Sequence, residues 1–340
     1  MEFAHFGSTT WSDPLEVTHD PSDLERGCWA VVVTFEGELT AVRFGRRHDG
    51  GVPPGDARRW PGTTGWRPTL DSRGYVDGVE EIRRRIAAGT VYQVNLTTLL
   101  ETPLPEEAHL PDLAAVLAGG NPAPFAGVVH VPSAGLDVVT ASPERYLTRE
   151  GPRLVSSPIK GTAPTIEAML TKDVAENVMI VDLVRNDLQH VCEPGTVAVE
   201  RLCAPESHPG LVHLVSDVVG TLRPGITWAD VLSATFPPGS VSGAPKSSAL
   251  TAIADLEPTP RGPYCGAIGW VDADHPAGPC GELAVGIRSF FATVDPDGVR
   301  RLRFGTGAGI TWASDPAGEW AECELKADVL VGLASGRVVT

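Results

Sequence analysis

The sequence has few basic residues for its length. Its 340 residues include 27 lysines and arginines against 43 aspartates and glutamates, which gives a net charge of −16. Nucleic acids and anionic membrane surfaces both select basic faces, so we expect no nucleic-acid partner and no membrane partner. If the substrate is an anion, the site must overcome this acidic field locally, and a Mg²⁺ ion is one way to do so.

Paired cysteines and long apolar runs are also missing. The six cysteines stand at positions 28, 192, 203, 265, 280 and 323, and none forms a C-x-x-C pair, so zinc is not indicated. Scattered cysteines fit a reducing cytoplasm. No apolar run is long enough to span a bilayer, and the N-terminus is not basic and then apolar. We therefore expect a cytoplasmic protein with a packed core, since 42% of the residues are hydrophobic.

Hydrophobic periodicity predicts a mixture of helices and strands after a loop-rich opening of about 70 residues. Helices are predicted at 71–88, 113–117, 166–188, 227–234, 247–256 and 316–331. Strands are predicted at 29–35, 39–44, 91–97, 125–131, 136–140, 197–202, 211–220, 264–272, 283–294 and 300–305. The length suits one large unit that mixes the two.

A lysine stands in the stretch Ser157-Pro158-Ile159-Lys160-Gly161-Thr162. Pro158 fixes its own φ, and Gly161 permits a backbone geometry that other residues resist. A lysine whose surroundings lower its pKa becomes a nucleophile at neutral pH. The alternative is an ordinary surface lysine in a turn, and these six residues alone favour that alternative.

Three other polar positions allow two interpretations each. Gln93 shares one face of the strand 91–97 with other polar residues, so this face either lines a polar cavity or is half exposed. Glu144 follows a proline and is either a turn carboxylate or a positioned acid. His213 lies inside a predicted strand, where a lone histidine is more often a hydrogen-bonded core residue than a catalytic one.

Two segments near the C-terminus could contact an anionic ligand. Arg288 lies in an apolar strand and would suit a carboxylate, which it can grip with two hydrogen bonds. The run 305–309, Gly-Thr-Gly-Ala-Gly, lets the backbone approach a ligand closely. The Gly/Ser/Pro loop 237–246 leads into a helix start that favours an anion, but it matches no nucleotide-binding motif.

Carboxylates on two predicted helices could bind a cation. Glu319, Glu322 and Lys326 stand at i, i+3 and i+7, on one helix face. Two carboxylates one turn apart can bind a hard cation that keeps some of its waters. A surface Glu–Lys pair is the simpler interpretation. Glu176 likewise lies on a helix whose charges either form a solvated face or orient a metal ligand.

Nine segments resemble the chorismate-utilising enzymes, the family of anthranilate synthase component I and aminodeoxychorismate synthase component I. They occur in the family's order: YQVNLT at 92–97, SPERYL at 142–147, SPIKGTAP at 157–164, ENVMIVDLVRNDL at 176–188, HLVSDVVGTL at 213–222, FPPGSVSGAPK at 236–246, YCGAIGW at 264–270, GIRSF at 286–290 and GAGITWASDPAGEWAECELKA at 307–327. The resemblance implies an α+β chorismate-binding fold, with large antiparallel sheets packed as a sandwich and outer helices. It implies a catalytic domain at 71–335 and a shortened N-terminal segment, 1–70, packed on it.

Two positions indicate the branch of the family. Isochorismate and salicylate synthases carry a water-activating lysine where this chain has Gln93, which cannot take a proton. Anthranilate synthases usually have alanine where this chain has Lys160. The chain is therefore most similar to 4-amino-4-deoxychorismate synthase component I. Anthranilate synthase component I and a non-catalytic chorismate-binding protein remain the alternatives.

The resemblance also implies roles for individual residues. Lys160 would attack C2 of chorismate while Glu144 protonates the leaving C4 hydroxyl, and ammonia from a glutamine amidotransferase partner would then displace the lysine. The product would lead to p-aminobenzoate and folate or to a specialised metabolite. Mg²⁺ would be held by Glu176, Glu319 and Glu322. Substrate contacts are expected at Gln93, His213, Ser242, Tyr264, Arg288, Gly307, Ala308, Gly309 and Lys326.

Overall fold

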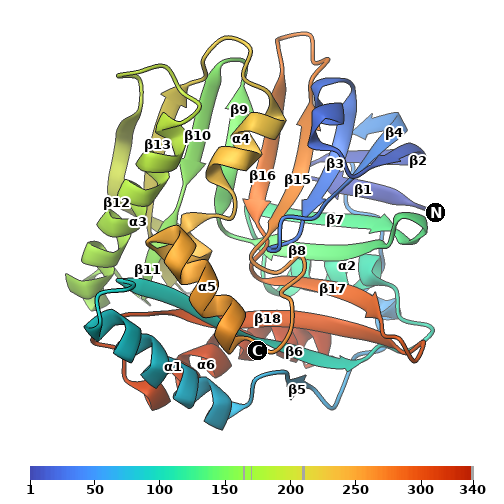
Figure 1. Ribbon diagram of the computed structural model, residues 1–340. Coiled ribbons are helices and arrows are strands. Elements are labelled where there is room, and N and C mark those ends of the chain that lie inside the picture. The colour runs from blue at the N-terminus through green and yellow to red at the C-terminus, as the bar shows by residue number, and fades with distance from the viewer. Residues whose placement is uncertain (164, 170, 209–210, 338–340) are drawn as a thin grey trace.

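One continuous antiparallel sheet organises the chain (Figure 1), and eighteen strands join it in the computed structural model, which describes residues 1–163, 165–169, 171–208 and 211–337. Positions 164 and 170, which belong to segments discussed above, lie outside the described residues. Each strand pairs with the next, so that one series of neighbours connects the whole sheet. The sheet has two halves, and their strands run in different directions (Figure 1).

The first half contains the strands drawn across the middle and lower part of Figure 1, and it ends at the strand labelled β1. Its neighbours in order are β6 (Gln93–Pro103), β18 (Arg300–Ile310), β17 (Ser289–Val294), β8 (Leu136–Ser142), β7 (Phe125–Val131) and β1 (Phe3–Phe6). Two short strands, β5 (Arg67–Pro68) and β14 (Gly243–Ala244), also pair with β6.

The second half continues from β1 through the upright strands. Its order is β2 (Thr9–Thr18), β4 (Leu39–Asp49), β3 (Cys28–Val33), β15 (Ala267–Asp272), β16 (Cys280–Val285), β9 (Arg145–Glu150), β10 (Arg153–Ser157), β13 (Leu211–Thr221) and β12 (Ala198–His208). The strand β11 (Ile159–Ala163) also pairs with β13.

Six helices cover the sheet. They are α1 (Ser72–Ala87), α2 (Leu110–Gly120), α3 (Thr171–Gln189), α4 (Trp228–Thr235), α5 (Lys246–Leu256) and α6 (Pro316–Ala334) among the described residues. Helix α3 packs on β11, β12 and β13, whereas α1 and α6 pack on each other and on β18. Asp71 and Asp315 cap the first turns of α1 and α6 by accepting hydrogen bonds from backbone N–H groups. These caps explain why both helices begin where the sequence predicts.

The apolar residues form two cores. The larger core joins the second half of the sheet to α1, α3, α4 and α5, and includes Trp29, Leu147 and Trp228. The smaller core lies between the first half, α2 and α6, and includes Phe290 and Leu113. No helix in the described part of the chain is long and apolar enough to cross a membrane.

The structure confirms the α+β class with its large antiparallel sheet and outer helices, and it corrects several elements. Residues 1–70 are not loop-rich, because β1 to β4 pair with each other, with β7 and with β15. The predicted strand 283–294 is two strands, β16 and β17, separated at Arg288, whose φ is +53°. The predicted helix 166–188 begins later, since Ile166–Ala168 forms only a 3₁₀ turn before α3.

Candidate active site

Lys160 lies on a bulged strand. Strand β11 pairs with β13 at Ile159 and again at Thr162, and the register shifts between these two positions. Gly161 supports the bulge with a φ of +91°, in the left-handed region that favours glycine. The prediction that Pro158 and Gly161 would give this lysine a defined backbone geometry agrees with the bulge, and the turn interpretation is wrong.

Burial lowers the pKa of the Lys160 amine because the ammonium form loses hydration. The Glu176 carboxylate acts in the opposite direction, and Lys326 adds to the lowering. Glu144 and Glu322 also favour the charged form. Charges from α3, from α6 and from Glu144, just before β9, therefore act on one amine, which is the situation that tunes a lysine toward nucleophilic chemistry.

Glu144 is a buried acid beside this amine. Only 4% of its surface is exposed. Burial raises the pKa of its carboxyl group to about 7, although hydrogen bonds from the Ser240 hydroxyl and the Ile159 backbone N–H and the charge of Lys160 act against the rise. The Glu144 backbone is fixed by Ser142, whose hydroxyl accepts from the Glu144 N–H at 3.2 Å. A carboxyl group with this pKa can donate a proton near neutral pH.

The wall opposite the amine consists of β6 and β18. A Cβ atom built on Gly309 would lie 2.2 Å from Gln93 Nε2 and 2.9 Å from Lys160 Nζ, so glycine leaves room for both side chains. Gln93 is 1% exposed, and its Oε1 atom has no hydrogen-bond partner among the described residues. The half-exposed interpretation of this strand is therefore wrong, and the amide faces a polar interior.

The glycine-rich run lies inside β18 rather than in a loop. A Cβ atom on Gly305 would overlap the ring of Tyr264, with its Cγ at 2.1 Å, so the ring is packed directly on the strand. Gly307 and Ala308 pair with Thr97 and Leu96 of β6. This part of the backbone is therefore rigid.

Arg288 lies at the break between β16 and β17. Burial lowers the pKa of its guanidinium, and the ion pairs found among the described residues do not include it. A half-buried guanidinium in this situation suits the carboxylate of a ligand.

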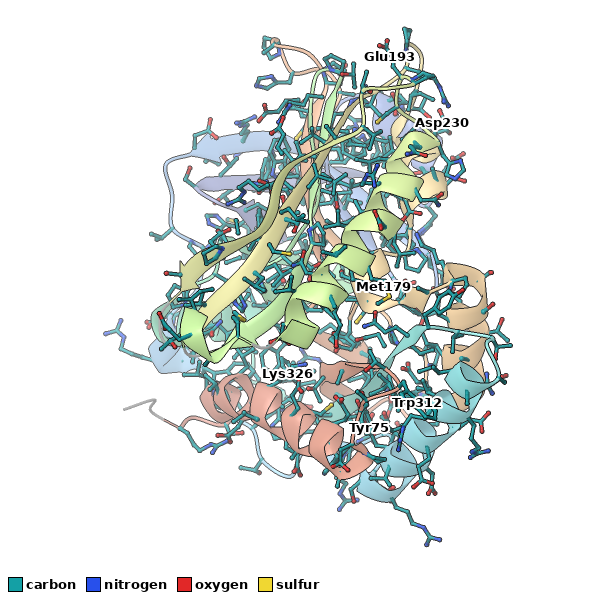
Figure 2. All side chains as sticks on the ribbon, turned by 90° about the vertical axis from the view of Figure 1, so that its left-hand side faces the viewer. Tyr75, Met179, Glu193, Asp230, Trp312 and Lys326 are labelled. Carbon is teal, nitrogen blue, oxygen red and sulfur yellow. The ribbon has the colours of Figure 1, made fainter. Side chains whose placement is uncertain are left out.

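Acidic residues of both α3 and α6, Glu176 and Glu322, act on the Lys160 amine. The Lys326 amine lies 2.7 Å from Glu322 Oε1 and donates to the Gly307 carbonyl at 3.0 Å. The predicted Glu–Lys pair is thus present, and Figure 2 shows Lys326 on the side of α6 that faces α3. Within the described ranges, no three His, Cys, Asp or Glu side chains are grouped closely enough to hold a metal ion. The expected set of Glu176, Glu319 and Glu322 stays a prediction.

His213 and Ser242 are both buried near this site. His213 Nδ1 and the Thr162 hydroxyl are hydrogen-bonded at 2.7 Å, and this bond orients the ring beside β11. The Ser242 hydroxyl donates to the Pro238 carbonyl at 3.0 Å. Ser242 therefore uses its donor to hold its own loop, the loop that also carries Ser240.

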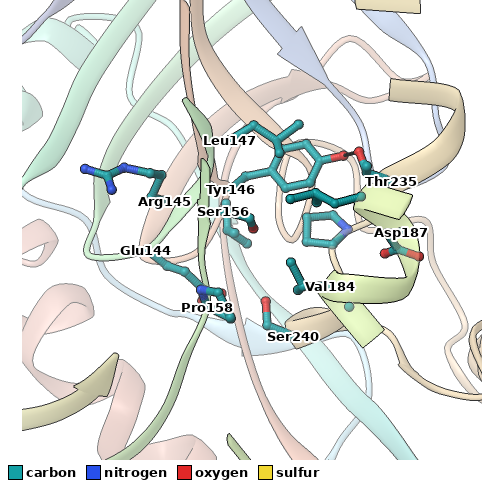
Figure 3. Close-up of a pocket in the computed structure, with 14 residues that line it drawn as sticks. Glu144, Arg145, Tyr146, Leu147, Ser156, Pro158, Val184, Asp187, Thr235 and Ser240 are labelled. Atoms are coloured by element: carbon teal, nitrogen blue, oxygen red, sulfur yellow. Dashed lines mark hydrogen bonds between the residues drawn. The ribbon is translucent and has the colours of Figure 1, made fainter. Parts of the chain in front are cut away.

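A small cavity lies behind Glu144 (Figure 3). It is lined by Tyr146, Asp187, Thr235 and Ser240, among others, and has a volume of about 10 Å³. This is the space of one water molecule, so the cavity is too small for an organic substrate. The cavity is a small gap among the side chains that pack against Glu144, and a substrate ring would not bind in it.

Sequence reasoning missed several residues that fix the site. Asn177 donates to the Lys160 carbonyl, Ser240 holds Glu144, and the Lys246 amine joins Asp187 at 2.7 Å. Arg261 donates to the carbonyls of Val241 and Asn95 at 2.9 and 2.7 Å. For Asn177 the sequence did carry a signal, because an amide stands in the apolar stripe of α3.

Comparisons with known proteins agree with this geometry. Residues 38–332 match the family described as chorismate binding enzyme. Anthranilate synthase component 1 of Streptomyces coelicolor is 39% identical over 274 residues, which cover 77% of this chain and 51% of that protein. Aminodeoxychorismate synthase component 1 of Bacillus subtilis is 34% identical, with 75% and 54% covered. The chain spans about half the length of these relatives.

Solved structures share the fold. Anthranilate synthase component I from Streptococcus pneumoniae superposes with a TM-score of 0.80 at 21% identity, covering 97% of this chain and 92% of that one. The menaquinone-specific isochorismate synthase MenF from Escherichia coli also gives 0.80, at 19% identity, covering 98% and 89%. With the family match over most of its length, this chain belongs to the chorismate-binding enzymes.

Proposed function

We propose that this chain is an aminodeoxychorismate synthase component I, which exchanges the C4 hydroxyl of chorismate for an amino group. The observation that carries the proposal is the pairing of a desolvated Lys160 amine with Glu144, a buried acid whose pKa is raised to about 7. Gln93 supports it further, because an amide at this position cannot act as the base that activates water.

Two displacements account for the exchange. The neutral Lys160 amine forms a bond to C2, the ring double bond shifts, and the C4–O bond breaks while Glu144 gives its proton to the leaving hydroxyl, which departs as water. Ammonia then bonds to C4, the double bond shifts back, and the C2–N bond breaks to release neutral Lys160. The new ammonium group returns one proton to Glu144, so both residues end in their starting states.

The remaining residues would hold the substrate. Arg288 and Lys326, with the β18 backbone at Gly307, would bind its carboxylates, which are the charges that a strongly acidic chain must attract. Gln93 Oε1 would accept a hydrogen bond from the ring hydroxyl of chorismate. Arg288 is suited to this role because burial has already removed much of its hydration.

Mg²⁺ fits the acidic side of the site. Mg²⁺ is usually bound by one or two carboxylates together with substrate oxygens and waters, so the absence of a three-residue group in the described chain is no obstacle. Glu176 and Glu322, whose charges both reach Lys160, would hold it, with Glu319 nearby. When bound, it would neutralise a substrate carboxylate and act as a Lewis acid.

Ammonia would come from a glutamine amidotransferase subunit. The names of the relatives as component 1 support such a partner. The product would serve p-aminobenzoate and folate synthesis or a specialised metabolite.

Anthranilate synthase component I is the second candidate. The relative from Streptomyces coelicolor carries that name and is more similar to this chain than the aminodeoxychorismate synthase cited above. The two activities differ in their products, because anthranilate is aromatic and fluorescent whereas aminodeoxychorismate is neither.

The test is a product assay. The purified chain is incubated with chorismate, MgCl₂ and an ammonium salt at about pH 8, and the product is identified by mass and absorbance. We expect a non-aromatic amino product from the native chain and none from Lys160→Ala or Lys160→Arg, with circular dichroism unchanged. Formation of anthranilate would establish the second candidate. Unaltered product formation by both variants would refute the proposed role of Lys160.

A further inference from the structure

The strand that carries Lys160 is not held by its own sheet at that residue. On β11, Ile159 pairs with Val215 and Thr162 with His213, and the bulge between them leaves Lys160 and Gly161 out of register with β13. Helix α3 lies directly against the bulge, because a Cβ atom on Gly161 would come within 2.9 Å of Asp173 Cβ. The nucleophile therefore depends on α3 for its position.

Asn177 of α3 supplies the missing hydrogen bonds. It is 1% exposed, and its Nδ2 atom donates to the Lys160 carbonyl at 3.1 Å and to the Leu214 carbonyl at 2.9 Å. Its Oδ1 atom accepts from the Ser216 hydroxyl at 2.5 Å, and the same hydroxyl accepts from the Cys203 N–H at 2.9 Å. One carboxamide thus joins α3 to β11 and β13, and through Ser216 to β12.

The orientation of this carboxamide is fixed. Both amide hydrogens have acceptors and the oxygen has a donor, so a flipped amide would face two carbonyl oxygens with its own oxygen. A fully satisfied buried polar network is rigid, whereas a partly satisfied one is costly. Glu176, whose charge acts on the Lys160 amine, is the preceding residue of the helix. The hydrogen bonds of Asn177 therefore fix the position of the Lys160 backbone and of the neighbouring Glu176 relative to each other.

We propose that Asn177 is a positioning residue for the Lys160 amine, because it ties the bulge of β11 to helix α3. This proposal rests on the proposed function and goes beyond it, by assigning the placement of the nucleophile to a side chain that does not touch the substrate. A displacement of about 1 Å at a reacting group can cost about 10²-fold in rate, so the tie matters for turnover more than for substrate binding.

The test is Asn177→Asp, which keeps the size of the side chain and the acceptor for Ser216. It replaces the donor by an oxygen that faces the Lys160 and Leu214 carbonyls. We expect kcat for amination to fall about 10- to 100-fold, with KM for chorismate within about threefold, because Arg288 and β18 lie outside this network. Amide hydrogen exchange should accelerate in β11 and the start of α3 but not in β18 or α6.

The matched control is Gln189→Glu, the same chemical change at an exposed position of the same helix, and its kcat should stay within about twofold of the native value. Should Asn177→Asp fail to fold, Ser216→Ala decides by the same criteria, with a smaller fall in kcat of about 3- to 10-fold. A kcat within twofold of the native value, a loss confined to KM, or unchanged exchange in β11 would overturn the proposal.

The same experiments separate this proposal from the proposed function. If the native chain forms no aminated product, the proposed function is refuted. Amide hydrogen exchange in β11 still tests whether Asn177 holds the bulge. If the native chain and Asn177→Asp aminate chorismate equally well, only the positioning role of Asn177 is refuted.

Discussion

Replacing Glu144 by glutamine should make the protein more stable and less active at the same time. The carboxyl group is buried, and burial raises its pKa from 4.5 to about 7. A shift of this size corresponds to about 3 kcal/mol. Glutamine has nearly the same shape and no charge, so Glu144→Gln removes the cost of keeping an ionised carboxylate in this site.

The direction of the pH effect follows from the raised pKa. Between pH 4.5 and about 7 the folded protein binds a proton at Glu144 that the unfolded chain has lost, so stability falls as pH rises through this window. The contribution is fully present below pH 4.5 and is lost above the folded pKa. Glu144→Gln lacks this loss, and its advantage over the native chain should grow by about 3 kcal/mol between pH 4.5 and pH 8.

The assay is thermal unfolding of both proteins at several pH values. For a chain of this length, about 3 kcal/mol corresponds to a rise of about 4 °C in Tm. Glu106→Gln, at an exposed site, is the control for the chemical change. Amination by Glu144→Gln should fall by about 10²- to 10⁴-fold, because the leaving hydroxyl loses its acid. A stability difference that does not change with pH would refute the burial argument, and undiminished turnover would refute the acid role.

Three further outcomes follow from the site. The ratio of kcat/KM of the native enzyme to that of Glu144→Gln should fall as pH rises above about 7, because the acid form of Glu144 is lost while Lys160 and ammonia titrate in both assays, and a ratio that stays constant to pH 9 would contradict this. Gln93→Lys should let water compete with ammonia, which liquid chromatography with mass detection would show as a second peak with the mass of chorismate, whereas amination alone would argue against water activation at this position. Gly309→Ala should lower kcat about 10- to 100-fold, since the new methyl group would lie 2.2 Å from Gln93 Nε2 and 2.9 Å from Lys160 Nζ, and native kinetics would show that these two side chains do not pack against Gly309.

Local signals predicted the elements that contain them. The helix predicted at 316–331 is observed as Pro316–Ala334, because its start is marked locally by a capping aspartate and by a proline in the first turn. Strand β2 shows the opposite case. It contains Pro14 and a left-handed Asp13, and its apolar residues Leu15 and Val17 are exposed. Its pairing with β1 and β4 forms it, and the sequence of the strand alone does not show those partners.

The same distinction holds within the site. Lys160 and Glu144 could be singled out because the family resemblance covers both segments, whereas the residues around each of them alone favoured a simpler interpretation. Apart from Asn177, the supports that sequence reasoning missed could not be singled out, since each is a contact between distant segments. The Arg261 guanidinium, for example, contacts Asn95, 166 residues earlier in the chain. Nothing near position 261 in the sequence indicates that this arginine braces the strand that carries Gln93.

The position of Arg288 follows from the way in which the two halves of the sheet are joined. Strand β16 pairs with β9 in the second half, and β17 pairs with β8 in the first half, so the chain must turn sharply between them. The turn is made at Arg288, whose φ of +53° carries a cost of about 1 kcal/mol or more in a residue other than glycine. Glycine would remove that cost but would also remove the guanidinium. A strained arginine where the two halves meet is therefore best explained by its side chain, which brings a positive charge into an acidic protein and suits the proposed role of Arg288 in binding a substrate carboxylate.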